Sequence, residues 1–201
     1  MYIKSDDVFI YPTDTVWGIG CSLYSEKGHA RISEIKKTSI NKPLSVMFTS
    51  VEDIFNNFNF PSEITLAWLI EFFKLETTLG YPAKTSKLKF PKWATGDSDY
   101  ISIRFLETVI VKNIYNDIHV PFFSTSLNIT GSNPIISTEE ALSFQKKYAS
   151  DALFFGENQI NDLSGTSSTI VFLNENLDFE IKREGRRVED VKKLLINLFN
   201  H

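Results

Sequence analysis

The sequence predicts an α/β protein built on a twisted, mixed sheet of parallel and antiparallel strands with helices on its faces. Apolar strand-like segments alternate with amphipathic helical segments, but the alternation is irregular. Two strand-like segments, Val8–Ile10 and Gly20–Tyr24, follow one another with no helical segment between them. This favours a mixed sheet over a regular doubly wound parallel sheet. The chain also lacks the glycine-rich phosphate loops of Walker and Rossmann type.

The individual elements follow from apolar periodicity and from capping residues. The apolar run Val8–Ile10 predicts a buried strand that ends at Pro12, because proline removes a backbone donor. Helices are predicted where apolar residues recur every three or four positions, and Ser62 is a candidate cap for one of them. The predicted helices cover residues 25–37, 62–74 and 188–198, with one more beginning at Ser137 or Thr138. The other predicted strands cover residues 44–48, 99–105, 122–126, 152–155 and 168–173.

Composition limits the class of protein. The chain has 201 residues, 42% of them hydrophobic, with 17 Phe, which is typical of a folded protein with a substantial core. We expect residues 1–201 to form a single domain. The net charge of −4 is not the footprint of a nucleic-acid-binding protein. The one cysteine, Cys21, excludes an internal disulfide framework and a cysteine-rich metal site.

Metal ligands, export and membrane insertion are not expected either. The three histidines, His29, His119 and His201, lack the spacing of metal ligands, so we expect no metal held by side chains. The N-terminus carries acidic residues where a signal peptide needs an apolar core, and no apolar run reaches membrane-spanning length. Together with the lone cysteine, these features predict a cytoplasmic protein without a membrane partner.

Polar residues suited to anions follow several of the predicted strands. Hydroxyls and a carboxylate follow the first strand, at Thr13–Thr15, although a plain strand, turn and strand would also explain them. Further polar groups lie at Ser33–Lys37, at Ser124–Asn128 with Gly131, and at Ser168–Thr169. Hydroxyls, an amide, a lysine and two arginines are the groups that bind phosphates and carboxylates.

Single residues of this set have simpler explanations. Lys36 alone would be interpreted as a solvated helix lysine, and Ser124–Ser126 as an ordinary strand end. Arg104 lies within a predicted strand and needs a nearby partner if it is buried, whereas Arg183 precedes the last helix. The functional interpretation therefore depends on the order in which the segments occur.

That order resembles one family, the YrdC-type (TsaC-type) threonylcarbamoyl-AMP synthases, in their short single-domain form. The stretch Tyr11–Cys21 resembles the opening signature of the family, and Ser124–Gly131 resembles its Ser-x-Asn-x-Ser-Gly signature. Four further segments match more weakly. Glu34–Val46 resembles a lysine segment followed by a strand, and Ser102–Arg104 resembles a strand arginine. Ser168–Val171 resembles a Ser-Thr-Val-Val strand, and Lys182–Gly185 resembles a closing Arg-x-Gly. The resemblance implies a YrdC-like fold over nearly the whole chain.

The resemblance also implies an activity and its partners. Members of the family join L-threonine, bicarbonate and ATP into threonylcarbamoyl-AMP and release pyrophosphate. Downstream threonylcarbamoyl-transfer proteins then modify a tRNA adenosine beside the anticodon. The resemblance implies that ATP is a substrate and that Mg²⁺ accompanies its polyphosphate. It also suggests tRNA as a further partner, through a weak direct contact.

Roles for individual residues come from the same resemblance. It implies that Lys36 is catalytic and binds the nucleotide. The other nucleotide-binding positions that it implies are Arg104, Ser126, Asn128, Ser168, Thr169 and Arg183. The threonine-binding positions that it implies are Thr13, Thr15, Thr78 and Ser124.

The chain departs from the family pattern near Lys36 and before Thr78. Thr38 and Ser39 stand where the family has arginine and proline, and Phe73–Thr78 keeps only the threonine of a Trp-Pro-Gly-Pro-x-Thr segment. Threonine cannot replace the charged fork of an arginine, although Lys37 is adjacent. The alternatives are therefore an RNA-binding module, a degenerate non-catalytic relative and a carbamoyl-transfer domain of the hydrogenase-maturation type.

Overall fold

The structure is a computed structural model that describes residues 2–156 and 163–198. Its strands are β1 (Val8–Pro12), β2 (Trp17–Ser22), β3 (Ser45–Phe48), β4 (Thr77–Pro82), β5 (Tyr100–Phe105), β6 (Phe122–Ser126), β7 (Leu153–Phe154), β8 (Thr169–Leu173) and β9 (Phe179–Arg183). Its helices are α1 (Glu26–Lys36), α2 (Val51–Asn57), α3 (Leu66–Phe73), α4 (Lys92–Thr95), α5 (Val109–Ile118), α6 (Thr138–Tyr148), α7 (Val188–Asn197) and the short 3₁₀ helix Ala83–Thr85.

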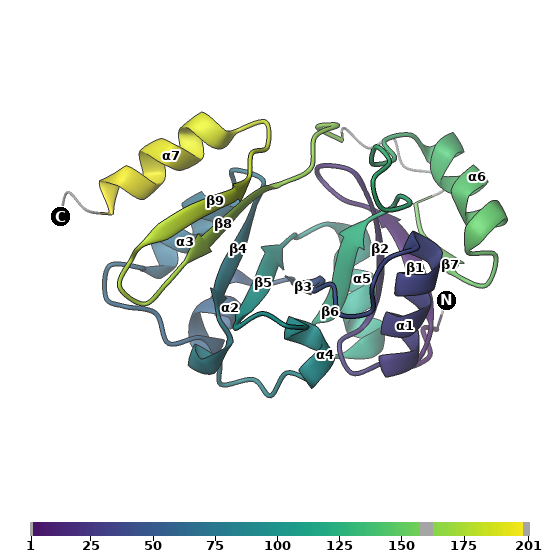
Figure 1. Cartoon of the computed structure of the whole chain (residues 1–201), viewed down its shortest axis with the longest axis horizontal. Coiled ribbons are helices and arrows are strands. Elements are labelled where there is room, and N and C mark those ends of the chain that lie inside the picture. The colour runs from purple at the N-terminus through teal and green to yellow at the C-terminus, as the bar shows by residue number, and fades with distance from the viewer. Residues whose placement is uncertain (1, 157–162, 199–201) are drawn as a thin grey trace.

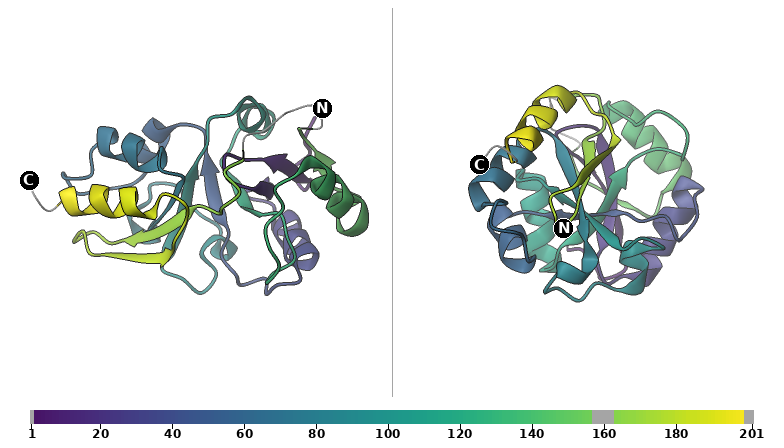
Figure 2. Two further views of the ribbon diagram at one scale, coloured as in Figure 1. Left: turned by 90° about the horizontal axis from the view of Figure 1, so that it is seen from above. Right: turned by 60° about the vertical axis from the view of Figure 1, so that its left-hand side comes forward.

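The strands form one mixed sheet in the order β7-β1-β2-β6-β3-β5-β4-β8-β9. The β1–β7, β3–β5 and β4–β8 pairs are parallel and the others are antiparallel, which confirms the predicted fold class. Figure 1 shows β4, β8, β9 and α7 at one end of the sheet and β1, β2, α1 and α6 at the other. The strands cross one another as the sheet twists, with helices on both sides of it (Figure 2).

Two of the four predicted helices begin at a capping serine where they were expected. The Ser25 hydroxyl accepts from the Gly28 N–H at 2.9 Å at the start of α1, and Ser137 caps α6 in the same way. The helix expected from Ser62 begins later, because residues 61–64 form a turn and Thr65, not Ser62, caps α3 through the Trp68 N–H. The expected start of that helix was therefore wrong by one turn.

Other strands and helices differ from the prediction. β2 begins at Trp17 rather than Gly20, because the Thr13 hydroxyl closes a tight turn by donating to the Val16 carbonyl at 2.6 Å. The sequence pattern did not reveal α2, α4, α5, β4 and β9. β4 escaped prediction because it contains Gly80 and Pro82, both rare in strand interiors, although all six of its residues are buried.

Two apolar clusters hold the sheet and the helices together. In the smaller one, α5 packs on Phe9, Tyr11, Met47 and Phe122. The larger one packs α1, α2, α3, α6 and α7 on residues of β1, β2, β3, β4, β5, β6 and β8. No helix in residues 2–156 and 163–198 is long and apolar enough to cross a membrane.

One register row of small residues crosses the middle of the sheet. Gly20, Ser124, Ser45, Ser102 and Gly80 are directly paired across β2, β6, β3, β5 and β4. Directly paired residues point to the same face of a sheet. Aromatic rings cover the two ends of the row, with Phe9 and Phe122 over Gly20 and Phe172 over Gly80. The three serines between them lie on the floor of the cavity described below.

Gly20 tests how tightly this row is packed. A Cβ atom at Gly20 would lie 2.4 Å from the Phe123 carbonyl oxygen and 2.8 Å from the Phe9 ring. We therefore expect Gly20→Ala to lower the free energy of unfolding by about 1–3 kcal/mol. Ser143→Ala on the exposed side of α6 is the control, with an expected change within about 0.5 kcal/mol. Urea unfolding of both variants measures the difference, and equal stabilities would contradict the packing described here.

Candidate functional site

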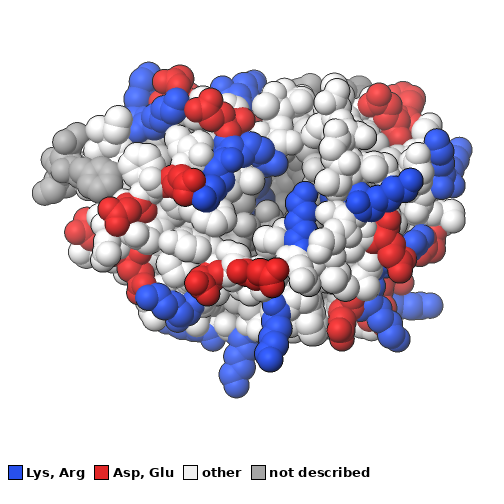
Figure 3. All heavy atoms as spheres, in the orientation of Figure 1, with Lys and Arg blue, Asp and Glu red and all other residues white. Residues whose placement is uncertain are grey.

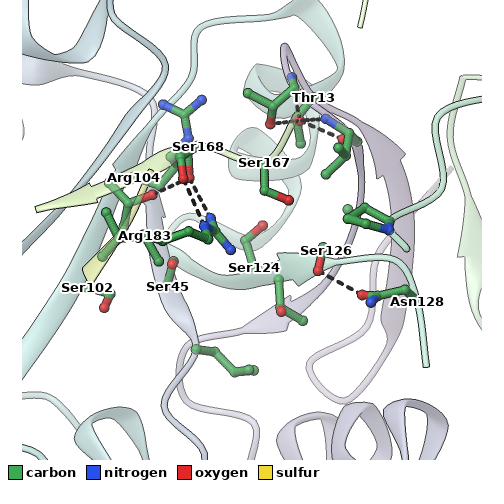
Figure 4. Close-up of a pocket in the computed structure, with 18 of the residues that line it drawn as sticks. Thr13, Ser45, Ser102, Arg104, Ser124, Ser126, Asn128, Ser167, Ser168 and Arg183 are labelled. Atoms are coloured by element: carbon green, nitrogen blue, oxygen red, sulfur yellow. Dashed lines mark hydrogen bonds between the residues drawn. The ribbon is translucent and has the colours of Figure 1, made fainter. Parts of the chain in front are cut away.

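A cavity of about 500 Å³ opens where β2, β6, β3, β5, β4, β8 and β9 meet. Figure 3 shows lysine and arginine side chains on both sides of a hollow in the middle of one face. The predicted site residues that line the cavity, many of them labelled in Figure 4, are Thr13, Thr15, Lys36, Thr78, Arg104, Ser124, Ser126, Asn128, Ser168 and Arg183. The fold thus brings together segments that are far apart in the sequence.

The charges of the lining are all of one sign. Lys36, Lys42, Arg104, Lys182 and Arg183 line the cavity, and no aspartate or glutamate does so among the described residues. Clustered cations with a partly desolvated floor attract anions and hold them more strongly than an exposed surface would. The cavity therefore suits an anionic ligand with several charged groups.

Lys36 is buried, so its interpretation as a solvated helix lysine is wrong. Its side chain lies at the end of α1 and the residue is only 3% exposed. The ammonium donates to the Ser126 carbonyl, to the Asn128 carbonyl at 3.0 Å and to Asn128 Oδ1 at 2.9 Å. Its three donors thereby hold the turn that follows β6 against the end of α1.

The environment of Lys36 changes its acidity. Burial, and to a smaller extent the positive charge of Lys42, lowers the pKa of the Lys36 ammonium to about 8. None of its three hydrogen-bond acceptors is a carboxylate. An anion bound beside Lys36 would supply the missing negative charge and raise this pKa again.

The turn after β6 is held by its own side chains as well. The Ser126 hydroxyl donates to Asn128 Oδ1 at 2.8 Å, and Asn128 Nδ2 donates to the Ser132 carbonyl at 2.6 Å. Gly131 has a φ of 89°, a backbone conformation that favours glycine. The Ser-x-Asn motif therefore shapes the cavity wall in addition to lining it.

Arg104 is buried and paired, as its place in a strand required. Its Nη2 donates to both carboxylate oxygens of Asp14 at 2.6 Å, and its Nη1 donates to the carbonyls of Thr77 and Phe105. The side chain of Asp14 is 31% exposed and that of Arg104 is 6% exposed. The guanidinium is thus fixed between β4 and the turn after β1.

Arg183 is anchored to the opposite wall. Its Nε donates to the Ser168 carbonyl at 2.9 Å and its Nη2 to the Ser168 hydroxyl at 3.0 Å, as Figure 4 shows. The Thr78 hydroxyl lies 2.9 Å from the same serine oxygen. Burial, followed by the nearby charge of Arg104, lowers the pKa of Arg183.

The threonines after β1 and Ser124 complete the rim. Thr13 Oγ1 lies 3.0 Å from Thr15 Oγ1 and accepts from two backbone N–H groups of its own turn. The Ser124 hydroxyl is hydrogen-bonded to the buried Tyr11 hydroxyl, and burial raises the pKa of this tyrosine well above its usual range. Tyr11 is therefore a neutral partner for Ser124 at physiological pH.

One predicted residue lies outside the lining. Thr169 is 1% exposed and its hydroxyl accepts from the Gly185 N–H at 3.1 Å. Its side chain fixes the start of the segment that follows β9 and is not part of the cavity wall. A direct nucleotide contact by this side chain does not fit its position.

Several polar and charged lining residues were not among the predicted site residues. Ser45 and Ser102 lie on the cavity floor, and Lys42 and Lys182 lie on its wall. The signal for Lys42 was its place directly before Pro43 in the segment that resembles the family. Lys182 precedes Arg183 in another such segment, so neighbouring matches gave the available signal for both lysines.

The residues beside Lys36 point elsewhere. Lys37 is the left-handed cap of α1, and its Nζ lies 5.9 Å from the centre of the Tyr148 ring. Neither Lys37 nor Thr38 lines the cavity, whereas Lys42 does. Lys37, although adjacent in the sequence, therefore does not take the place of the missing arginine in this geometry.

The described residues contain no group of three or more His, Cys, Asp or Glu side chains arranged to hold a metal ion. The cavity itself offers magnesium only hydroxyl, amide and carbonyl oxygens, without the carboxylates that usually bind this ion. These residues fit a magnesium ion that arrives on a ligand's phosphates and do not fit one held by the protein alone.

The low pKa of Lys36 predicts how binding depends on pH. We expect the affinity for ATP, the nucleotide that the resemblance implies, to be nearly constant between pH 7 and pH 7.5. Above about pH 8 the affinity should fall, by up to about tenfold per pH unit, because Lys36 loses its proton in the free protein. Calorimetric titration measures this profile. Lys36→Met should bind more weakly with a flat profile, and a wild-type affinity that stays constant to pH 9.5 would contradict the assignment.

Comparison with known proteins identifies relatives of this chain. The model of a family named Sua5_yciO_yrdC and described as "Telomere recombination" matches residues 1–185. A threonylcarbamoyl-AMP synthase of Pasteurella multocida is 31% identical over 141 residues, which cover 69% of this chain and 75% of that protein. The enzyme of the same name from Enterobacter sp. (strain 638) is 28% identical over 142 residues, covering 70% of this chain and 73% of that protein.

Solved structures share the fold. P. abyssi Sua5 complexed with L-threonine superposes with a TM-score of 0.76 at 22% identity, covering 96% of this chain and 55% of that one. E. coli YciO superposes with a TM-score of 0.67 at 19% identity, covering 90% of this chain and 84% of that one. This chain spans about half the length of the P. abyssi protein. From the family match and the shared fold, we conclude that the chain belongs to the Sua5/YciO/YrdC family.

Proposed function

We propose that this protein is an L-threonylcarbamoyladenylate synthase. It would join L-threonine, bicarbonate and ATP into threonylcarbamoyl-AMP and release pyrophosphate. The product would pass to proteins that transfer the threonylcarbamoyl group to a tRNA adenosine next to the anticodon. Relatives that carry the name threonylcarbamoyl-AMP synthase support this reaction.

The observation that carries the proposal is the cavity with five cations and no carboxylate among its described lining residues. Both reactants of the proposed step are anions, since threonine reacts as its carbamate and ATP presents its α-phosphate. Two unit charges about 4 Å apart repel by roughly 4 kcal/mol near a protein surface. A cluster of fixed cations offsets this repulsion without any rearrangement during the reaction.

The proposed step uses the cavity residues mainly for positioning and charge. The amine of threonine takes up carbon dioxide from bicarbonate to give the carbamate. A carbamate oxygen then forms a bond to the α-phosphorus, and the bond to the leaving pyrophosphate breaks. Lys36 and Arg183 would stabilise the charge that gathers there, while Ser126 and Asn128 orient the nucleotide. Magnesium would accompany the polyphosphate of ATP.

Arg104, expected from the resemblance to bind the nucleotide, is paired with Thr78 and bonded to Asp14, so we assign it instead to the threonine side of the cavity. The hydroxyls of Thr13, Thr15, Thr78 and Ser124 lie on the same side. Arg104 is already fixed by Asp14 and two carbonyls, so its position needs no ordering when a ligand binds. We further propose that residues 1–201 act as one domain, because a single sheet runs through both ends of the described chain. The free thiol of the buried Cys21 supports a cytoplasmic location.

Pyrophosphate release tests the proposed function. We expect wild-type protein to release pyrophosphate from ATP only when threonine and bicarbonate are both present. Lys36→Ala should abolish this release, and because it also removes three hydrogen bonds to the turn after β6, circular dichroism at the assay temperature checks that the variant remains folded. Release that needs neither threonine nor bicarbonate, or no release at all, would favour a nucleotide-binding, RNA-binding or carbamoyl-transfer role instead.

Lys42 would supply the positive charge that the family has as an arginine at the position of Thr38. Lys42 lines the cavity and lies near enough to Lys36 to lower its pKa. We therefore expect Thr38→Arg to change kcat/KM by less than about threefold. In a Lys42→Ala background the same substitution should raise kcat/KM by about tenfold, because the long arginine side chain can extend from position 38 toward the cavity and return a positive charge to it. Steady-state kinetics of the four proteins measure this, and a large gain with Lys42 intact would refute compensation.

A further inference from the structure

Three serines lie side by side on the floor of the cavity. Ser45 of β3 is paired with Ser124 of β6 on one side and with Ser102 of β5 on the other. Paired residues share one face, with Cβ atoms about 4.5–5.5 Å apart. Figure 4 shows the three side chains along the lower edge of the cavity. We call Ser124, Ser45 and Ser102 the serine row.

Two hydroxyls of the serine row are free to bind a ligand. Ser124 is engaged by the Tyr11 hydroxyl. Ser45 and Ser102 are half-buried cavity residues, and neither side chain has a hydrogen-bond partner in the part of the chain that the structure describes. Half-buried hydroxyls without protein partners gain most from a ligand that both donates and accepts.

The surroundings of the row indicate the kind of group that it would bind. The charged donors lie on the walls, with Lys36 at the end of α1 and Arg183 on β9. The next row on the same face carries Met47, Arg104 and Thr78 in register. Charged ends of a ligand would therefore be met by the cations, and the neutral row suits an uncharged polar group. A hydroxyl fits this description, whereas a phosphate or carboxylate would favour the cations.

We propose that Ser45 and Ser102 recognise the side-chain hydroxyl of the amino-acid substrate and thereby select threonine over valine, which has a methyl group in place of that hydroxyl. This inference rests on the proposed function. A site whose polar groups are left unpaired by the wrong substrate discriminates far better than one that only measures size. The row is bounded at both ends by aromatic rings, because Phe9 and Phe122 lie over Gly20 and Phe172 lies over Gly80.

The test compares threonine with valine in two assays, pyrophosphate release and direct amino-acid binding by calorimetry in the presence of a non-hydrolysable ATP analogue. We expect Ser45→Ala and Ser102→Ala each to lower the threonine-to-valine ratio of kcat/KM by about tenfold, and the double variant to lower it by about 100-fold. The loss should come from a raised KM for threonine, with the KM for ATP unchanged. The threonine-to-valine ratio of binding constants should fall in parallel.

Ser167→Ala is the matched control, because Ser167 is another half-buried lining serine that lies outside the row. Whatever its effect on rate, it should leave the threonine-to-valine ratio unchanged. A ratio that stays at the wild-type value in the double variant overturns the inference and leaves the proposed function intact. An equal loss of ratio in Ser167→Ala also overturns it. Wild-type protein that neither binds threonine nor releases pyrophosphate overturns the function and the inference together.

Discussion

The cavity depends on a buried ammonium that has no carboxylate partner. Lys36 is 3% exposed, and its three donors are met by two backbone carbonyls and one amide oxygen of residues 126–128. Leaving such a charge unpaired would cost several kcal/mol, so the chain must bring three oxygens to one point. The turn after β6, with its serine, asparagine and left-handed Gly131, provides them. Replacing the lysine would therefore change the wall of the cavity as well as its charge.

The cations of the cavity differ in whether a carboxylate of the protein pairs with them. Asp14 neutralises Arg104, and Glu180 lies within salt-bridge distance of Lys182. Lys36, Lys42 and Arg183 have no salt bridge to a carboxylate within the described residues. The protein thus balances the charges that fix its walls and leaves a surplus of positive charge facing the cavity. A polyphosphate together with a carbamate would supply the charge that balances this surplus.

The sequence predicted what depends on short segments and missed what depends on pairing between distant ones. Apolar runs such as Val8–Ile10 became strands, and Ser25 and Ser137 cap helices where these were expected, whereas Ser62 does not. The burial of Lys36 could not be predicted from the helical pattern around it. The turn that covers this end of α1 lies 90 residues further along the chain. Ser45 and Ser102 were outside the predicted site for the same reason, since their neighbours are set by strand register.

The contacts that close the cavity join residues that are far apart in the sequence. Lys36 meets Ser126, Asp14 meets Arg104, and Thr78 meets Ser168, and each pair is separated by 90 residues. Contacts between residues so far apart form late in folding, because the entropy cost of closing a long loop comes before the contacts can stabilise the chain. During synthesis the N-terminal motif leaves the ribosome long before β8 and β9 exist. The nascent chain therefore has no assembled binding site until its last strands are made, so ligands can stabilise only the nearly complete protein.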